Sequence, residues 1–424
     1  MPPIKRSIRF ALLLSVFLLP VAHLKVVIFG IPFYSVELPI VVALFAYGWG
    51  WRKKIFLPRG VSVRDPFFLG IALFVSGALL SFFANPFSLT GLGMLKTWFA
   101  FPLVWVWLWI ETDPDSPNTE YALLWWLGSI ALGSFASMTY FFRGALSYDG
   151  RLMGWYTSPN YLAFFLAPGI LLAYSFCFHP LFSKKKIFRY VFFAVLLLLA
   201  VTVFFTHSYG VWSGIVLAGL FILFFDKTVA LSWHKKVFAI ILLGVLCGIF
   251  IFFESGSEKW QALTSFQERS SFSSRIMIWQ AAIKIIGEHF FLGIGIGRFQ
   301  EVYLSYQQYF PPYLEWAVPQ PHNVYLALWL QTGLVGLAGF VFLVSAWIAR
   351  MMAIVSSRSS GAAQSTAVLL IALLILTLVT GITDTPFFKT DLAYMFWYCI
   401  AFGIGFLNRQ KSARDCNKGA SIKS

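Results

Sequence analysis

One segment of the sequence sets a histidine directly before a long apolar run. Pro321, His322 and Asn323 precede VYLALWLQTGLVGL. Pro321 can occupy the first turn of a helix, which places His322 and Asn323 at the N-terminal end of that helix. The positive end of the helix dipole disfavours imidazolium, so we expect a neutral His322, the form that a general base requires. Capping or packing at an interface is the alternative interpretation of this histidine.

Several other polar residues next to apolar runs are candidate substrate ligands. Arg275 lies at the start of SSRIMIWQAAIKIIGEHFF, Arg298 follows the glycine-rich FLGIGIG, and Arg151 begins RLMGWYTSPNYLA. Guanidinium groups bind phosphate and diphosphate through forked hydrogen bonds. His207 and Tyr209 lie in a short link, where ordinary interfacial residues are the alternative interpretation.

The candidate residues favour one kind of substrate. The sequence has no cysteine–histidine metal spacing and no serine nucleophile elbow, and we expect no cofactor. A base and several arginines beside apolar spans suit a molecule with a diphosphate and an apolar tail. A lipid-linked sugar has this chemistry.

The composition predicts an all-α integral membrane protein. The chain has 424 residues, of which 59% are hydrophobic and 12% charged, whereas soluble domains have about 25% charged residues. Hydropathy predicts about twelve transmembrane helices. They are expected at residues 8–24, 34–51, 66–84, 92–110, 121–142, 159–179, 187–206, 210–226, 236–253, 322–349, 366–384 and 390–407.

The charged residues predict the orientation. With both termini in the cytoplasm, the inner segments carry the whole net charge of +15, as the positive-inside rule requires. The charge therefore indicates no nucleic-acid partner. We expect a multi-pass protein of the cytoplasmic membrane whose first apolar run is an uncleaved span. The membrane domain would cover residues 1–408, followed by a basic cytoplasmic tail at 409–424.

A long loop at residues 254–321 is expected on the extracytoplasmic side. Its length predicts a functional segment. It contains an amphipathic helix with Ser273 or Ser274 as the N-cap, which is expected to lie on the membrane surface or against the bundle. The helical stripe is Ile276, Trp279, Ile283, Ile286 and Phe290. The glycines at 293, 295 and 297 predict a flexible hinge after this helix.

Three segments carry a resemblance to a known family. HNVYLALWLQTGLVGL, from 322 to 337, resembles the signature of the O-antigen ligase and polymerase family. SSRIMIWQAAIKIIGEHFFLGIGIGRF is similar to the arginine-led outer helix of that family, and RLMGWYTSPNYLA to its Arg-x-x-Gly…Pro-Asn segment. The resemblance is most specific at about 150–350, the expected ligase-like core.

The resemblance implies a GT-C-like, metal-independent, inverting glycosyltransferase. Such an enzyme transfers a glycan from an undecaprenyl-diphosphate-linked donor to an acceptor hydroxyl at the outer face of the membrane. His322 would activate the hydroxyl and Arg275 would hold the donor diphosphate, with Arg151 and Arg298 as weaker candidates for that role. Asn323, Tyr209 and His207 complete the expected substrate-binding set.

The sequence departs from the family at two positions. Tyr209 stands where the family usually has an arginine, so one diphosphate ligand is missing or supplied elsewhere, for example by Arg151 or Arg143. Gln331 stands where a glutamate is common.

Several alternatives stay open. A ligase uses a lipid or protein acceptor and a polymerase uses another lipid-linked glycan, and the sequence does not separate the two. A lipid-linked glycan flippase is the alternative function, but transporters place their ionisable residues near the bilayer midplane. A peptidoglycan polymerase would need an acidic catalytic residue in the outer loop, and Glu301 and Glu315 lack a matching context.

Overall fold

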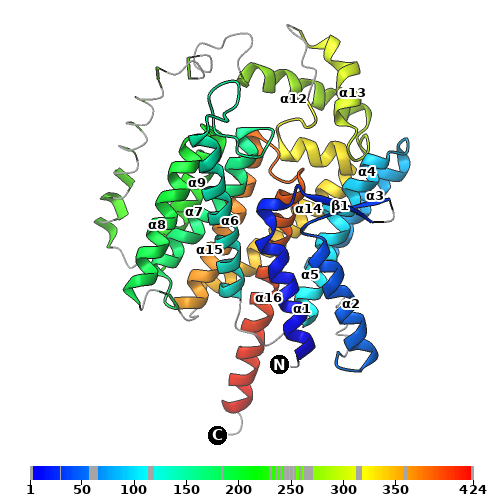
Figure 1. The fold of residues 1–424 in the computed structure, drawn as a ribbon. Helices are drawn as coiled ribbons and strands as arrows, with labels where there is room; N and C mark the ends of the chain where they lie inside the picture. The colour runs from blue at the N-terminus through cyan, green and yellow to red at the C-terminus, as the bar shows by residue number, and fades with distance from the viewer. Residues whose placement is uncertain are drawn as a thin grey trace.

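The computed structural model describes residues 3–28, 30–56, 65–112, 119–182, 185–228, 271–311, 318–357 and 361–421, with scattered residues between 232 and 261. Most of these residues are helical (Figure 1). The helices are α1 Pro3–Phe17, α2 Leu38–Arg52, α3 Pro66–Ala84, α4 Leu89–Leu95, the π-helical turn η2 Lys96–Ala100, α5 Phe101–Thr112, α6 Thr119–Phe142, α7 Pro159–Phe178, α8 Lys186–Phe204, α9 Tyr209–Phe225, α12 Ser271–Glu288, α13 Phe299–Tyr306, α14 Val324–Ser356, α15 Gly361–Thr383 and α16 Thr390–Ser421. Two short 3₁₀ turns, η1 Leu19–Val21 and η3 Gln307–Tyr309, and an antiparallel hairpin of β1 Lys25–Ile28 and β2 Ile31–Tyr34 complete the set.

Eight of the described helices are long and apolar enough to cross a membrane. They correspond to the predicted spans 66–84, 92–110, 121–142, 159–179, 187–206, 322–349, 366–384 and 390–407. A ninth helix, α9, is apolar but has only 17 residues. The predicted span 236–253 lies largely outside the described residues. A largely helical, multi-pass membrane protein is therefore confirmed.

The N-terminal region differs from the predicted spans. Helices α1 and α2 have 15 residues each, or about 22 Å, which is less than the roughly 30 Å of a bilayer core. The predicted span 8–24 is wrong at its C-terminal end, because α1 ends at Phe17 and the chain turns into the β1–β2 hairpin. The strand residues 25–28 and 31–34 are mostly apolar and include several β-branched side chains, so hydropathy alone does not reveal their strand conformation.

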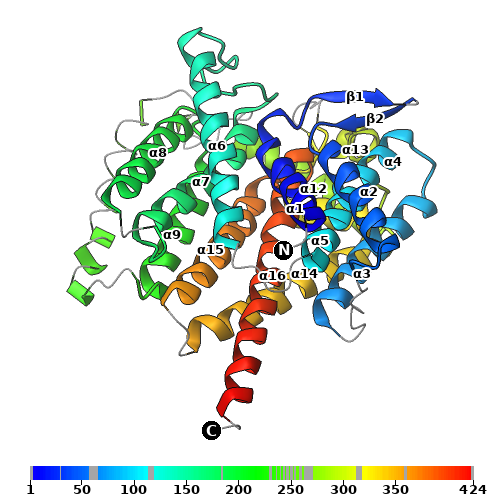
Figure 2. The ribbon, with the colours of Figure 1, turned by 60° about the horizontal axis from the view of Figure 1, so that its bottom comes forward.

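Helices α15 and α16 form the centre of the bundle, with α6 to α9 on one side and α1 to α5 on the other (Figure 2). Their middle turns, 367–374 and 391–404, are buried throughout. Helix α16 continues to Ser421, so the predicted tail from residue 409 begins as helix. Arg409 within this extension pairs with Glu120 at 3.2 Å.

A glycine interrupts α14. Gly333 has φ 66° and ψ −176°, which divides the helix into 324–332 and 334–356. The second part, about 35 Å long, is sufficient to cross a bilayer. Segment 293–297 packs beside the break: Ile294 N donates to Leu330 O at 2.7 Å, and a Cβ on Gly293 would lie 2.3 Å from that same oxygen. The predicted hinge is therefore wrong, since its glycines serve close packing.

The predicted amphipathic helix is confirmed as α12, which lies with α13 across the end of the bundle opposite the two termini (Figure 1). The packed face is offset from the predicted stripe, because Ile276 and Ile283 are exposed. The side chains that pack toward α13 and α14 are Ile278, Ala281, Ala282, Ile285 and Ile286. Apolar residues cover more than one face of this helix, so periodicity alone does not select the face that packs.

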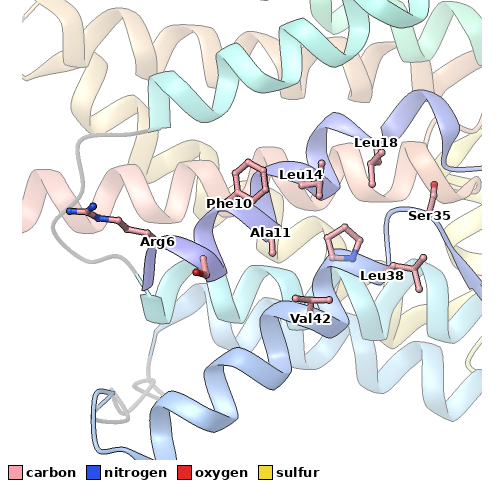
Figure 3. A pocket seen from close by; sticks show the side chains of 10 residues that line it. Arg6, Phe10, Ala11, Leu14, Leu18, Ser35, Leu38 and Val42 are labelled. Carbon is pink, nitrogen blue, oxygen red and sulfur yellow. The ribbon is translucent and has the colours of Figure 1, made fainter. Parts of the chain in front are cut away.

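A groove lies between α1 and α2, and Figure 3 shows its mainly apolar lining. Its volume is about 730 Å³. Arg6 lies at one end of the groove, and Ser35, in the turn between β2 and α2, lies at the other. None of the lining residues belongs to the site described next.

Candidate functional site

Asp384 is the residue around which the candidate site is built. It directly follows α15, and its side chain is only 5% exposed. Four groups approach its carboxylate: His322 Nδ1 at 3.1 Å and the Thr385 backbone N at 2.9 Å on Oδ1, Asn160 Nδ2 at 2.8 Å and Arg275 Nη2 at 3.9 Å on Oδ2. Elements α7, α12, α14 and α15 therefore meet at one carboxylate.

The N-cap of α14 places His322 beside Asp384. Asn323 Oδ1 accepts hydrogen bonds from two backbone N–H groups of the first turn, each at 3.0 Å. The other end of the same amide donates to Ile382 O at 2.9 Å. Because Ile382 lies in the last turn of α15, one asparagine both caps α14 and fixes it to the segment that carries the carboxylate.

His322 lies outside the helix, which corrects the prediction that Pro321 occupies its first turn. Helix α14 begins at Val324, and His322 has a φ of 50°. A left-handed conformation costs a non-glycine residue about 1–3 kcal/mol and is typical of functional sites. Trp279 Nε1 supports it by donating to Pro321 O at 2.9 Å and more weakly to His322 O at 3.3 Å.

The helix dipole falls off beyond the first turn, so the neighbouring carboxylate dominates the surroundings of His322. Burial alone would raise the pKa of Asp384, but the charge and hydrogen bond of His322, together with Arg275, hold that pKa at about 2. An ionised carboxylate only accepts hydrogen bonds, so Nδ1 of His322 carries a proton. In the neutral imidazole, Nε2 is then the nitrogen that can accept a proton.

Arg275 contacts Asp384 without being fully occupied by it. Its Nη2 lies 3.9 Å from the carboxylate, farther than the 2.7–2.9 Å typical of a charge-assisted hydrogen bond. Its Nε is buried and has no hydrogen-bond partner among the described residues. The side chain is 23% exposed. The guanidinium can therefore bind an additional anion.

The start of α7 contributes the amide of the site. Ser158 is the N-cap, with its hydroxyl accepting from Asn160 N at 3.3 Å, and Pro159 is the first helical residue, as predicted. This cap directs Asn160 toward Asp384. Just before α7, the Tyr156 hydroxyl donates to Asp391 of α16. Burial and the Asp391 charge raise the pKa of Tyr156 well above its usual value.

The other predicted arginines have partners of their own. Arg151 Nε donates to Asp149 at 2.6 Å, and Arg298 pairs with Glu301 at 3.0 Å. Within the described part of the chain, neither contacts Asp384. Tyr209 is the first residue of α9, with its ring 5.9 Å from that of Trp260. His207 has a φ of 45° and lies 5.6 Å from the ring of Phe204.

Gln331, the second departure noted in the sequence, is buried. Its Oε1 accepts from Gly297 N at 3.0 Å, and its Nε2 donates to Gln320 at 2.7 Å. The side chain therefore fixes the glycine-rich segment against α14. A neutral amide suits this position because it must both accept and donate.

Sequence reasoning missed two residues of the site, namely Asp384 and Asn160. Asp384 lies near a span end, where contact with the interface explains it equally well. The available signal was the sequence TDTPFFKTD, which sets two acids and a lysine between two strongly apolar helices. Buried acids require partners, but sequence does not say which.

The arrangement can take a proton and stabilise an anion. His322 offers Nε2 as the acceptor, Asp384 orients the imidazole and stabilises its charged form, and Arg275 offers a guanidinium. Across the described residues, no group of three or more His, Cys, Asp or Glu side chains is arranged as metal ligands would be.

One comparison with known families is informative. Residues 193–341 match the family model described as O-antigen ligase. The matched range contains Arg275 and His322 but ends before Asp384. No curated protein matches the chain. The family match confirms the resemblance seen in the sequence.

Proposed function

We propose, from the match of residues 193–341 to the O-antigen ligase family model, that the protein is a membrane glycosyltransferase that uses an undecaprenyl-diphosphate-linked glycan as its donor. The observation that carries the proposal is the convergence of His322 and Arg275 on Asp384. This convergence supplies a base, its orienting carboxylate and an anion ligand within one end of the bundle.

The proposed step is an inverting transfer. The acceptor hydroxyl oxygen attacks the anomeric carbon, and its proton moves to His322 Nε2. A bond forms between the acceptor oxygen and that carbon, while the bond from the carbon to the donor phosphate oxygen breaks. The undecaprenyl diphosphate leaves with both bonding electrons, and Arg275 stabilises its charge. Protein cations fill this role in the proposal, so it requires no metal ion.

We place the reaction at the outer face of the cytoplasmic membrane, with both termini inside. The positive-inside distribution of charge supports this orientation. The site lies at the end of the bundle opposite both termini (Figure 1), as this topology requires. The acceptor is a lipid, a protein or another lipid-linked glycan, and so ligase and polymerase activities share the same proposed chemistry.

The test is transfer from a purified undecaprenyl-diphosphate-linked glycan by the protein in nanodiscs. We would compare the wild type with His322→Asn, because asparagine tolerates the left-handed backbone of residue 322. Loss of the general base should lower kcat by about 10²–10⁴-fold. His289→Asn is the matched control, since His289 is an exposed histidine at the end of α12.

Two results would count against the proposal. One is full activity of His322→Asn in a correctly inserted protein. The other is movement of the donor lipid across the bilayer by the wild type without any glycan transfer, which would support the transporter instead.

A further inference from the structure

Lys389 lies on the turn that begins at Asp384 and leads into α16. Its ammonium lies 4.8 Å from the ring centroid of Tyr161 and 5.3 Å from that of Tyr156. Tyr161 directly follows Asn160, whose amide donates to Asp384 at 2.8 Å. Through both the chain and the tyrosine contacts, Lys389 belongs to the same cluster as His322 and Arg275.

The aromatic contacts position this lysine. A cation over an aromatic face gains about 0.5–2 kcal/mol, depending on how far it is desolvated. Tyr156 is itself held by its hydrogen bond to Asp391. The two rings lie near the ammonium of Lys389, while the residue remains partly exposed.

No described carboxylate lies within ion-pair distance of the ammonium, and Asp391 interacts with it only through its charge at longer range. Lys389 makes no ion pair within 4.0 Å, and its Nζ donates no hydrogen bond, as far as the described residues extend. An ammonium group carries three N–H donors. All three therefore remain available to a ligand.

Lys96 is a lysine with a structural role and provides a comparison for the contacts of Lys389. Its ammonium also lies near aromatic rings, 5.0 Å from Phe33 and 5.2 Å from Phe101. However, it pairs with the buried Glu37 at 2.6 Å and donates to Pro32 O at 2.7 Å. Lys96 is paired with a buried carboxylate, whereas Lys389 forms no ion pair among the described residues.

We propose that Lys389 is a second cationic ligand for the donor diphosphate, acting together with Arg275. The inference rests on the proposed function. A diphosphate carries more than one negative charge, and Arg275 shares its charge with Asp384. A second cation near the same cluster, without an ion-pair partner in the described part of the chain, would neutralise the remaining negative charge of the diphosphate. A lysine is suited to this role as a compact charge that serves phosphate oxygens without the fixed geometry of a guanidinium.

The test separates binding from turnover. Donor KM and kcat would be measured for wild type, Lys389→Met and Lys389→Arg in nanodiscs, with binding of undecaprenyl diphosphate measured in parallel. Methionine keeps the length and apolar stem of the lysine, so packing on the tyrosines is retained. We expect Lys389→Met to raise donor KM and weaken binding of undecaprenyl diphosphate by about 10- to 100-fold, the value of a charge-assisted hydrogen bond. Lys389→Arg should recover most of this loss.

Lys284→Met is the matched control. Lys284 is also a lysine over a tyrosine ring, 5.5 Å from Tyr309, and it lies in α12. It pairs with Glu288 at 3.0 Å instead of remaining free. This variant should leave donor KM and lipid binding unchanged.

Three outcomes would overturn the inference. These are an unchanged donor KM in Lys389→Met, a rise in acceptor KM alone, or an equal loss in Lys389→Met and Lys389→Arg accompanied by a lower melting temperature. If the wild type binds undecaprenyl diphosphate through Lys389 but transfers no glycan, the proposed function fails while the ligand assignment stands.

Discussion

Replacing Asp384 by asparagine tests whether the site requires a carboxylate that accepts hydrogen bonds on both oxygens. The carboxylate now accepts hydrogen bonds from His322 and Thr385 on one oxygen and from Asn160 on the other, and Arg275 Nη2 lies 3.9 Å from that second oxygen. An asparagine has a single acceptor oxygen and an NH₂ group that only donates. In either orientation of the amide, its NH₂ group must face N–H donors, either those of His322 and Thr385 or those of Asn160 and Arg275.

Each orientation has a definite cost. If the NH₂ of the new side chain faces Asn160 and Arg275, an amide contact is lost and the guanidinium loses its carboxylate. If it faces His322, the imidazole must accept at Nδ1 and carry its proton on Nε2, which is the wrong nitrogen for a base. Loss of a hydrogen bond to a charged group costs about 1.5–3 kcal/mol. That cost corresponds to about a 10- to 100-fold loss. The wrong tautomer removes the full contribution of a general base, about 10²–10⁴-fold. We therefore expect kcat of Asp384→Asn to fall by about 10- to 10⁴-fold, depending on the orientation that the amide adopts.

The assay is glycan transfer in nanodiscs, with kcat and KM determined separately and the melting temperature recorded. Asp226→Asn is the matched control, because Asp226 is also a buried carboxylate, accepting from Ser365 Oγ at 2.8 Å and Thr228 N at 2.8 Å. Ser365 lies near the opposite end of α15, about 28 Å along the helix from Asp384. Equal losses of activity in the two variants would refute the role assigned to Asp384.

Three further predictions concern stability. The pKa of Asp384 is depressed to about 2 from an ordinary 3.8, so its ionisation stabilises the fold by about 2 kcal/mol above pH 4, and this contribution is lost as the pH falls toward 2. Acidification should therefore lower the melting temperature of the wild type more than that of Asp384→Asn. Parallel curves of melting temperature against pH for the two proteins would contradict this. Asn323→Ala removes the N-cap of α14, so we expect a loss of about 1 kcal/mol by chemical denaturation, and no change would show that the cap is dispensable. Gly333→Ala places a Cβ 2.4 Å from Phe291 O at a φ of 66° and should lower the melting temperature clearly, whereas Gly287→Ala, with nothing within 4 Å of the added Cβ, should not.

Local features of the fold were predictable from the sequence. The long apolar runs correspond to the eight membrane-length helices, because about 20 apolar residues are enough to span a bilayer as a helix. The start of α7 followed from Ser158 and Pro159, whose capping preferences act within one turn. The amphipathic period likewise gave α12. In each case the determining interactions are between residues close in sequence.

The tertiary structure decided the composition of the site. His322 and Asp384 are 62 residues apart, and Asn160 and Asp384 are 224 apart, so no local pattern shows that they meet. An acid near the end of an apolar run has the same sequence signature whether it faces water or a buried histidine. The packing of α7, α12, α14 and α15 removes water from Asp384 and leaves its charge to be balanced by protein groups. The sequence by itself therefore determined which segments form membrane-length helices and which residues were candidate site residues. The long-range packing determined which charged side chains surround the buried carboxylate of Asp384.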